Sequence, residues 1–328
     1  MPILHAHDLN GPHPGKPLDE PQAIEALRDD SLAWVHLDGT NHVAPEWIAT
    51  HLDYLDPQAI EALTEEETRP RVTILGHGIL IILRGMNFNE GEDPEDMVSV
   101  RVWLDDHRIV TIARRHVRAI EDLRSDIRHG DVPADTAVFL SRLVERLNMR
   151  IADFLRDLDD LADDLETDVF AEKSGGLRKR VVDARLQVIT ARRYIAPQRD
   201  ALADLTRAKV AFLSQATQRD MHEEQVGLTR IVEGLDELRD RLTVLREELS
   251  GQTSDRLNGN MYVISVLSAV FLPLSFLTGL FGVNVGGMPG VADGQAFLWL
   301  CLWMGGLFAV QMALLAAMRW LRRPGKSD

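Results

Sequence analysis

The sequence predicts an α/β domain at the N-terminus, long helices after it, and two transmembrane α-helices near the C-terminus. Short apolar segments separated by turn residues fill the first part of the chain, as in a mixed sheet with helices. Apolar residues at helical spacing dominate the middle of the chain. Residues 261–281 and 296–318 are uncharged, and each segment is long enough to cross about 30 Å of hydrocarbon.

These patterns divide the chain into seven segments. They are an α/β domain (1–133), a long antiparallel helical pair (134–218), a stalk helix (219–260), a first transmembrane helix (261–281), a connecting loop (282–295), a second transmembrane helix (296–318) and a basic tail (319–328).

Within the α/β domain, alternation and turn signals predict individual elements. The predicted strands are Ala33–Leu37, Arg71–Leu75, Gly78–Arg84, Met97–Leu104 and Arg108–Ala113. The predicted helices are Pro45–Tyr54, Pro57–Glu65 and Val117–Arg128. His5, His7 and His13 lie in a Pro/Gly-rich N-terminus, which we expect to be disordered rather than a zinc site, because no further ligand is identifiable.

Three long helices are expected after Pro133. Asp135–Glu172 and a helix from Leu177 to about Gln215 form the antiparallel pair, broken by two glycines. The third begins near Arg219. If it is continuous from Met221 to Phe281, it is about 90 Å long at 1.5 Å per residue, which exceeds a globular core and predicts a stalk that enters a membrane.

The charge distribution excludes some functions and orients the chain. The net charge is −15; the tail contributes +3 and Asp293 contributes −1, which leaves −17 for residues 1–260. Such a surface repels nucleic acid and concentrates cations. The acid-rich stretches Asp157–Asp164 and Asp236–Glu248 are candidate regulatory cation sites, with a solvated helix face as the default reading. The one cysteine, Cys301, lies in a predicted membrane helix, so disulfides and cysteine-based zinc sites are excluded.

The ends of the membrane segments predict the topology. Arg319, Arg322 and Arg323 follow the second segment, whereas the loop between the segments has no basic residue. The positive-inside rule therefore places the tail in the cytosol, and two crossings place the N-terminal domain there as well. No secretory signal precedes that domain. We expect a multi-pass protein of the inner (plasma) membrane with both termini cytosolic.

A stripe of small and polar residues follows one face of the first membrane helix. Its members recur at alternating steps of three and four: Asn258, Met261, Ser265, Ser268, Leu272, Ser275 and Gly279. Close helix packing and the lining of a pore are equally compatible with this pattern. Two helices per chain cannot enclose a conduit, so a pore requires a ring of subunits. The stripe is uncharged, and a divalent cation would pass along it hydrated.

The end of the same helix carries a resemblance to a known family. Phe271–Gly279 and the following segment Gly279-Leu280-Phe281-Gly282-Val283-Asn284-Val285-Gly286-Gly287-Met288-Pro289-Gly290 resemble the CorA superfamily of divalent-cation transporters. Val283 replaces the methionine of that family's Gly-Met-Asn signature, and this form is similar to the ZntB-like branch, associated with zinc. Gly290 stands where many members have an acidic residue, which weakens the expected attraction of cations by the external loop.

The resemblance implies a funnel-shaped homopentamer with the first membrane helix of each chain lining the pore. It also implies that Gly282, Val283 and Asn284 form the external mouth, where Asn284 oxygens hold the hydrated cation. The implied function is transport of Zn²⁺, coupled to protons. The alternatives are a Mg²⁺, Co²⁺ or Ni²⁺ channel gated by metal at cytosolic acidic sites and, more distantly, a membrane-anchored scaffold or signalling coiled coil. The expected partners are further copies of the chain, the lipid bilayer and divalent cations; no nucleic acid, cofactor or enzymatic site is expected.

Overall fold

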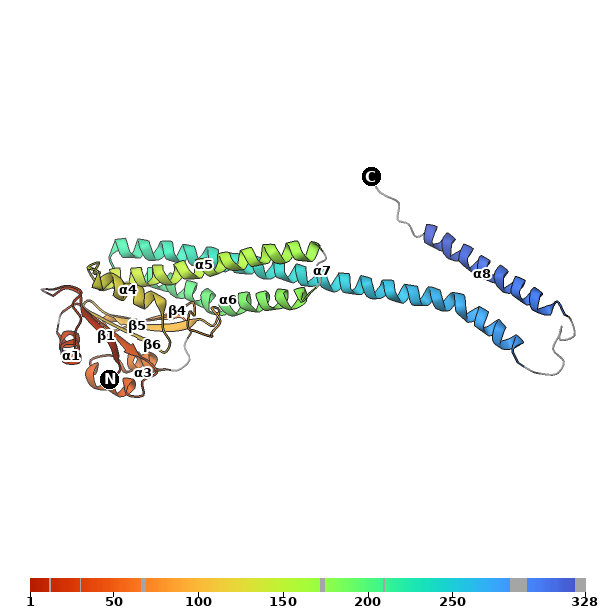
Figure 1. The fold of residues 1–328 in the computed structure, drawn as a ribbon. Helices are drawn as coiled ribbons and strands as arrows, with labels where there is room; N and C mark the ends of the chain where they lie inside the picture. The colour runs from red at the N-terminus through yellow and green to blue at the C-terminus, as the bar shows by residue number, and fades with distance from the viewer. Residues whose placement is uncertain are drawn as a thin grey trace. The chain divides into compact units, whose positions relative to one another are not determined.

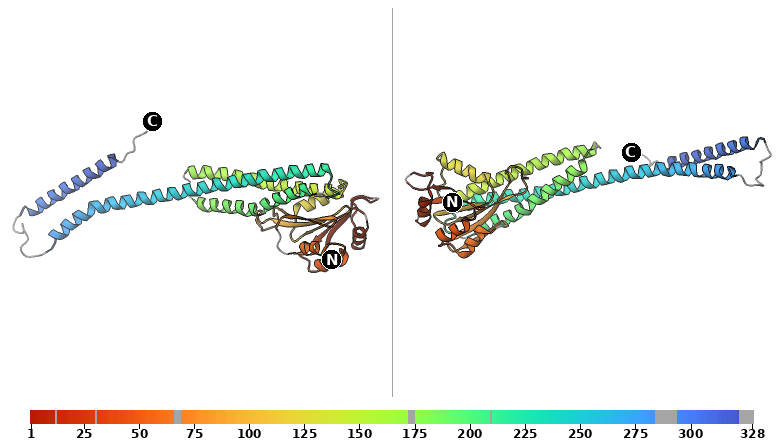
Figure 2. Two further views of the ribbon diagram at one scale, coloured as in Figure 1. Left: turned by 180° about the vertical axis from the view of Figure 1, so that it is seen from behind. Right: turned by 60° about the horizontal axis from the view of Figure 1, so that its bottom comes forward.

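The protein is described by a computed structural model that covers residues 1–11, 13–29, 31–65, 69–171, 175–208, 210–283 and 294–321. The chain divides into two compact units, Met1–Glu248 and Leu249–Asp328. Figures 1 and 2 show the ribbon from three directions.

A six-stranded sheet forms the centre of the first unit (Figure 1). Its strands are β1 (Ile3–Asp8), β2 (Ala33–Asp38), β3 (Arg71–Leu75), β4 (Gly78–Gly85), β5 (Val98–Leu104) and β6 (Arg108–Ala113). Their order is β1-β2-β6-β5-β4-β3. Among the described strands, β2 and β6 pair in parallel and the other neighbours are antiparallel. The strands from β3 to β6 follow one another directly in sequence, as hairpins favour, whereas α1 lies between β1 and β2.

Three short helices cover one face of the sheet. They are α1 (Glu20–Arg28), α2 (Ala44–His51) and α3 (Pro57–Thr64), and each has a proline in its first turn. Asp19 caps α1 through a reciprocal capping box with Gln22. Leu27, Ile48 and Leu63 from these helices join the apolar side chains of the strands in one buried cluster, which fixes the helices on the sheet.

The opposite face packs against α4 (Arg118–Arg128), α5 (Thr136–Phe170) and α6 (Leu177–Arg207). The rings of Trp34 in β2 and Phe139 in α5 lie 5.0 Å apart. Gly85 at the end of β4 leaves room for Leu147 of α5, whose methyl carbon would lie 2.7 Å from an added Cβ. The first unit is therefore a three-layer α/β/α arrangement, as Figure 2 shows from behind.

The N-terminus is a strand, and the expectation of disorder there is wrong. His5 and His7 lie in β1 and are buried beside Trp34 and His36 of β2. The rings of His5 and His36 are 4.8 Å apart, and His36 Nδ1 is 2.8 Å from the Thr111 hydroxyl. Burial lowers the pKa of His5 to about 2 and the pKa of His36 to about 4, because desolvation disfavours the charged imidazolium.

The long helices pack together through apolar seams and ion pairs. Helix α7 spans Gln215–Phe281, and its part within the first unit buries Leu235, Leu238 and Leu242. Arg192 of α6 donates two hydrogen bonds to Asp236 of α7, at 2.7 and 3.0 Å.

Helix α6 ends at Arg207, earlier than the predicted Gln215. Ser214 then accepts a hydrogen bond from the backbone N–H of Thr217 and so caps the start of α7.

The second unit contains the C-terminal part of α7 and helix α8 (Ala296–Leu321). Both helices contain an 18-residue apolar window long enough to cross a membrane, and almost none of either window is buried inside the chain. The predicted architecture, an α/β domain with a long helix and two apolar C-terminal helices, is confirmed.

Candidate functional site

The stripe predicted on the first membrane helix is an exposed surface of α7. All seven members, Asn258, Met261, Ser265, Ser268, Leu272, Ser275 and Gly279, are exposed in the single chain. Leu272, for example, is 74% exposed. We call these seven residues the α7 stripe. It combines hydroxyls, an amide and apolar side chains, and it carries no charge.

A different face of α7 contacts α8. Val270 is buried, and Val266, Pro273, Leu274 and Leu277 are half-buried at the same helical spacing. The half-buried residues of α8 also recur at steps of three and four: Leu300, Met304, Leu307, Gln311 and Leu315. At 100° per residue, the centre of the α7 face that contacts α8 is roughly 150° from the centre of the α7 stripe. The second membrane helix therefore leaves the stripe uncovered.

Serine hydroxyls on the α7 stripe are bound to their own helix. Ser265 Oγ donates to the Met261 carbonyl at 2.8 Å, and Ser268 Oγ donates to the Ile264 carbonyl at 2.9 Å. Each hydroxyl proton is therefore used in a hydrogen bond to the same helix, and no acceptor from a neighbouring helix is required. The oxygen lone pairs then remain available as acceptors. Water in the shell of a cation turns its hydrogens outward, so acceptor oxygens are the groups that such water would meet.

A hydrogen bond between α7 and α8 compensates for a proline. Pro273 has no N–H, so the helix cannot satisfy the carbonyl four residues earlier, that of Ala269. Gln311 of α8 donates its Nε2 to this Ala269 carbonyl at 3.4 Å. Within a membrane an unsatisfied carbonyl is costly, so this contact stabilises the helix pair. The sequence signal was present, because a proline in a membrane helix predicts a polar group on a neighbour, but our sequence analysis missed it.

The predicted mouth is described only in part. Gly282 N–H donates to the carbonyls of Thr278 at 2.9 Å and Gly279 at 3.2 Å, which ends α7. A Cβ at position 282 would lie 2.9 Å from the Thr278 oxygen, so glycine fits this close turn. Val283 is 48% exposed. Asn284 lies outside the described residues, and its predicted role remains a prediction.

The acidic stretches of the first unit are engaged with arginines of the same chain. Arg241 of α7 lies between Asp159, Asp163 and Glu166 of α5, with nitrogen–oxygen distances of 3.8, 2.5 and 2.9 Å. Hydrogen bonds from Arg192 lower the pKa of Asp236. In the described part of the chain, no group of three histidine, cysteine or acidic side chains is arranged to hold a metal ion. These contacts favour the structural interpretation of both acidic stretches.

Comparisons with known proteins agree with this architecture. The profile of the family described as "CorA-like Mg2+ transporter protein" matches residues 29–323. The zinc transport protein ZntB of Yersinia enterocolitica is 36% identical over 292 residues, which cover 87% of this chain and 88% of that protein. The divalent cation transporter CmaX of Pseudomonas aeruginosa is 35% identical over 97% of each chain. A solved structure of the full-length CmaX protein superposes with a TM-score of 0.84, at 33% identity, over 97% of this chain and 98% of that one.

Proposed function

This chain belongs to the CorA-like Mg²⁺ transporter family, and from that premise we propose that it carries Zn²⁺ across a membrane, driven by a proton gradient. The position of the α7 stripe is the observation that supports a pathway along α7. The stripe is polar, exposed and turned away from the chain's own α8. The choice of zinc rests on the similarity to proteins named for zinc transport.

A ring of identical subunits completes the proposed pathway. One stripe forms one wall, and further copies of the chain supply the others; five copies are the number that the family resemblance implies. In this ring the α7 stripes face the axis and the exposed Trp299 and Trp303 of α8 face lipid. The N-terminal domain and the tail lie in the cytosol, as the charge asymmetry of the sequence indicates.

In the proposed mechanism the cation keeps its water shell. The stripe carries no charge that could replace lost hydration, and dehydration of a divalent ion would be prohibitive in a membrane. Ser265, Ser268 and Ser275 accept hydrogen bonds from the shell. Leu272 and Met261 narrow the same pathway with apolar side chains, which can close it by excluding water. At the external end, a ring of Asn284 amide oxygens orients the incoming hydrated ion.

Cysteine accessibility tests the assignment of the stripe. Cys301 is the single cysteine, so Cys301→Ser gives a cysteine-free background. Into it we would introduce either Ser268→Cys on the stripe or Leu267→Cys, at a residue that is also exposed in the single chain but is off the stripe. After treatment with a charged methanethiosulfonate reagent, zinc uptake into proteoliposomes should fall for Ser268→Cys and stay unchanged for Leu267→Cys. Equal responses of the two variants would refute the pathway along the stripe.

A further inference from the structure

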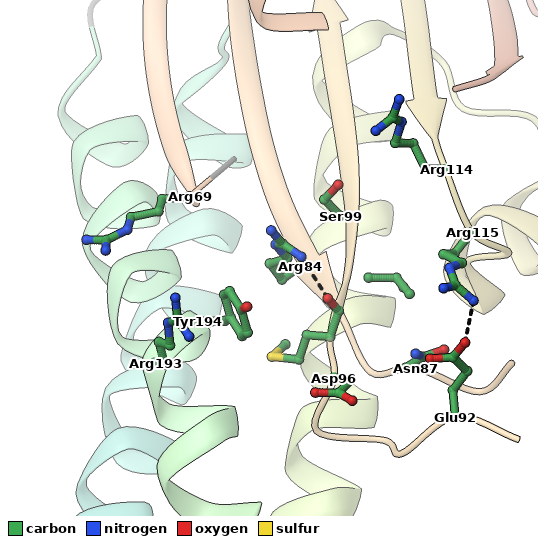
Figure 3. Close-up of a pocket in the computed structure, with 12 residues that line it drawn as sticks. Arg69, Arg84, Asn87, Glu92, Asp96, Ser99, Arg114, Arg115, Arg193 and Tyr194 are labelled. Atoms are coloured by element: carbon green, nitrogen blue, oxygen red, sulfur yellow. Dashed lines mark hydrogen bonds and ion pairs between the residues drawn. The ribbon is translucent and has the colours of Figure 1, made fainter. Parts of the chain in front are cut away.

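We propose that a cavity in the first unit binds a small anion through a phosphate group. The cavity has a volume of about 500 Å³ and lies between the sheet and α6 (Figure 3). Its lining includes five arginines, Arg69, Arg84, Arg114, Arg115 and Arg193. Among the described residues of the lining, the carboxylates are Glu92 and Asp96, so this described part of the lining carries a formal charge of +3.

The charge of this lining is opposite to that of its surroundings. Residues 1–260 carry a net charge of −17, so a group of five guanidinium ions is not part of a generally basic surface. Surface potentials act over about 8–10 Å at physiological salt. An anion would therefore be repelled by most of this domain and attracted only close to the cavity, which favours a local binding site over diffuse anion attraction.

Neighbouring contacts hold two of the arginines in place. Arg84 donates from Nη1 to the Met97 carbonyl at 2.8 Å, and its guanidinium carbon is 4.6 Å from the centre of the Tyr194 ring. The guanidinium carbon of Arg193 is 5.6 Å from the same ring centre. Figure 3 shows the Tyr194 ring between these two side chains. These contacts fix the positions of two guanidinium groups at the cavity.

The chemistry of the lining suits phosphate. Guanidinium groups match the oxygens of phosphate through paired hydrogen bonds. Asn87 is buried, and its Oδ1 already accepts from the backbone N–H of Asn89 at 3.1 Å and from Asn89 Nδ2 at 2.6 Å. The Asn87 side chain can therefore offer a ligand its Nδ2 donor. Glu92 is held by Arg115, so one of the two carboxylates is compensated within the lining.

The same contacts indicate which part of a ligand is recognised. The Tyr194 ring already interacts with guanidinium groups, so it is not an open platform for a nucleobase. A volume of about 500 Å³ exceeds the space that inorganic phosphate needs. Inorganic phosphate and a phosphate ester of a small metabolite share the recognised group, and a titration with each separates the two sources.

Calorimetric titration of the full-length protein in detergent tests the proposal. The probes are inorganic phosphate and glucose 6-phosphate in metal-free buffer, with citrate and chloride as comparison anions. We expect saturable binding of at least one phosphate probe, with a Kd at least tenfold higher for Arg193→Gln and for Arg69→Gln. Both side chains are exposed, so the variants should unfold at the wild-type temperature when no ligand is present.

Arg207→Gln is the matched control, because Arg207 is an exposed arginine of α6 that pairs with Asp204 and is outside the cavity lining. It should bind phosphate as the wild type does. The proposal is overturned if neither phosphate probe binds below about 10 mM, if Arg207→Gln loses as much affinity as Arg193→Gln, or if citrate or chloride binds more tightly than both phosphate probes. None of these readouts depends on metal flux, so the proposal is tested independently of transport.

Discussion

Acid should destabilise the first unit through its buried histidines. His5 and His36 are opposite each other in the paired strands β1 and β2, and both are buried. Desolvation lowers the pKa of both, and the nearby charges of Arg124 lower them further; Asp38 partly offsets this for His36. His7, beside them, also has a lowered pKa because it is buried.

The sign and size of the effect follow from proton linkage. In the unfolded chain these histidines bind protons below pH 6.5, whereas folded His5 and His36 bind them only near pH 2 and pH 4. Their contribution to stability is therefore complete above pH 6.5 and is lost progressively as the pH falls below that value. At pH 5, 1.5 pH units below the unfolded value, the loss is about 2 kcal/mol per histidine at roughly 1.4 kcal/mol per unit.

Urea unfolding of the full chain in detergent, at pH values from 8 to 5, measures this loss. Pulsed amide hydrogen exchange of peptides from β1 and β2 reports the first unit specifically. Because carboxylates also titrate in this range, the informative quantity is the difference between wild type and His5→Leu. That difference should shift by about 2 kcal/mol in favour of His5→Leu between pH 7 and pH 5. His42→Leu, at an exposed histidine, is the control. Identical pH dependence in wild type and His5→Leu would show that burial of His5 does not lower stability in acid.

Three further substitutions have defined outcomes. Asn284→Ala should abolish or deregulate metal flux in proteoliposomes without changing the elution volume of the assembly; normal flux and selectivity would exclude Asn284 from the mouth. Gln311→Leu should destabilise the helix pair by about 1 kcal/mol in detergent, as membrane hydrogen bonds typically contribute. In the Pro273→Ala background this loss should vanish, because position 273 then donates to the Ala269 carbonyl; a persistent loss would contradict the compensation. Arg241→Met should lower the free energy of unfolding, measured by urea titration, by about 1 kcal/mol. Added salt should make this difference smaller, because it screens the ion pairs. An unchanged free energy of unfolding would show that the ion pairs of Arg241 with the three α5 carboxylates do not stabilise the fold.

Local sequence patterns predicted the regular elements well. The hairpin around Gly76 and the alternation in Val98–Leu104 depend on neighbouring residues, so their elements were found close to the observed bounds. Strand β1 was missed because its burial depends on distant partners. His5 is buried because β2, 28 or more residues later, pairs with β1 and places Trp34 and His36 beside it.

Part of the candidate site could also be predicted from local sequence patterns, and part could not. Helical spacing alone predicted the α7 stripe from Asn258 to Gly279, because residues three and four apart lie on one face of a helix. The sequence left helix packing and pore lining equally open, and only the contact of Val270 with the α8 face shows that the stripe is turned away from α8. The arginine cavity was not predicted, because Arg69, Arg84 and Arg193 come from segments that only the folded sheet brings together.

Zinc uptake into proteoliposomes of the purified protein measures the proposed transport itself. Uptake of Zn²⁺ and of Mg²⁺ would be compared with and without an imposed pH gradient. We expect zinc entry that the gradient accelerates. Magnesium flux that ignores the gradient would contradict the assignment of zinc and of proton coupling, and the absence of flux for either ion would contradict transport along the α7 stripe.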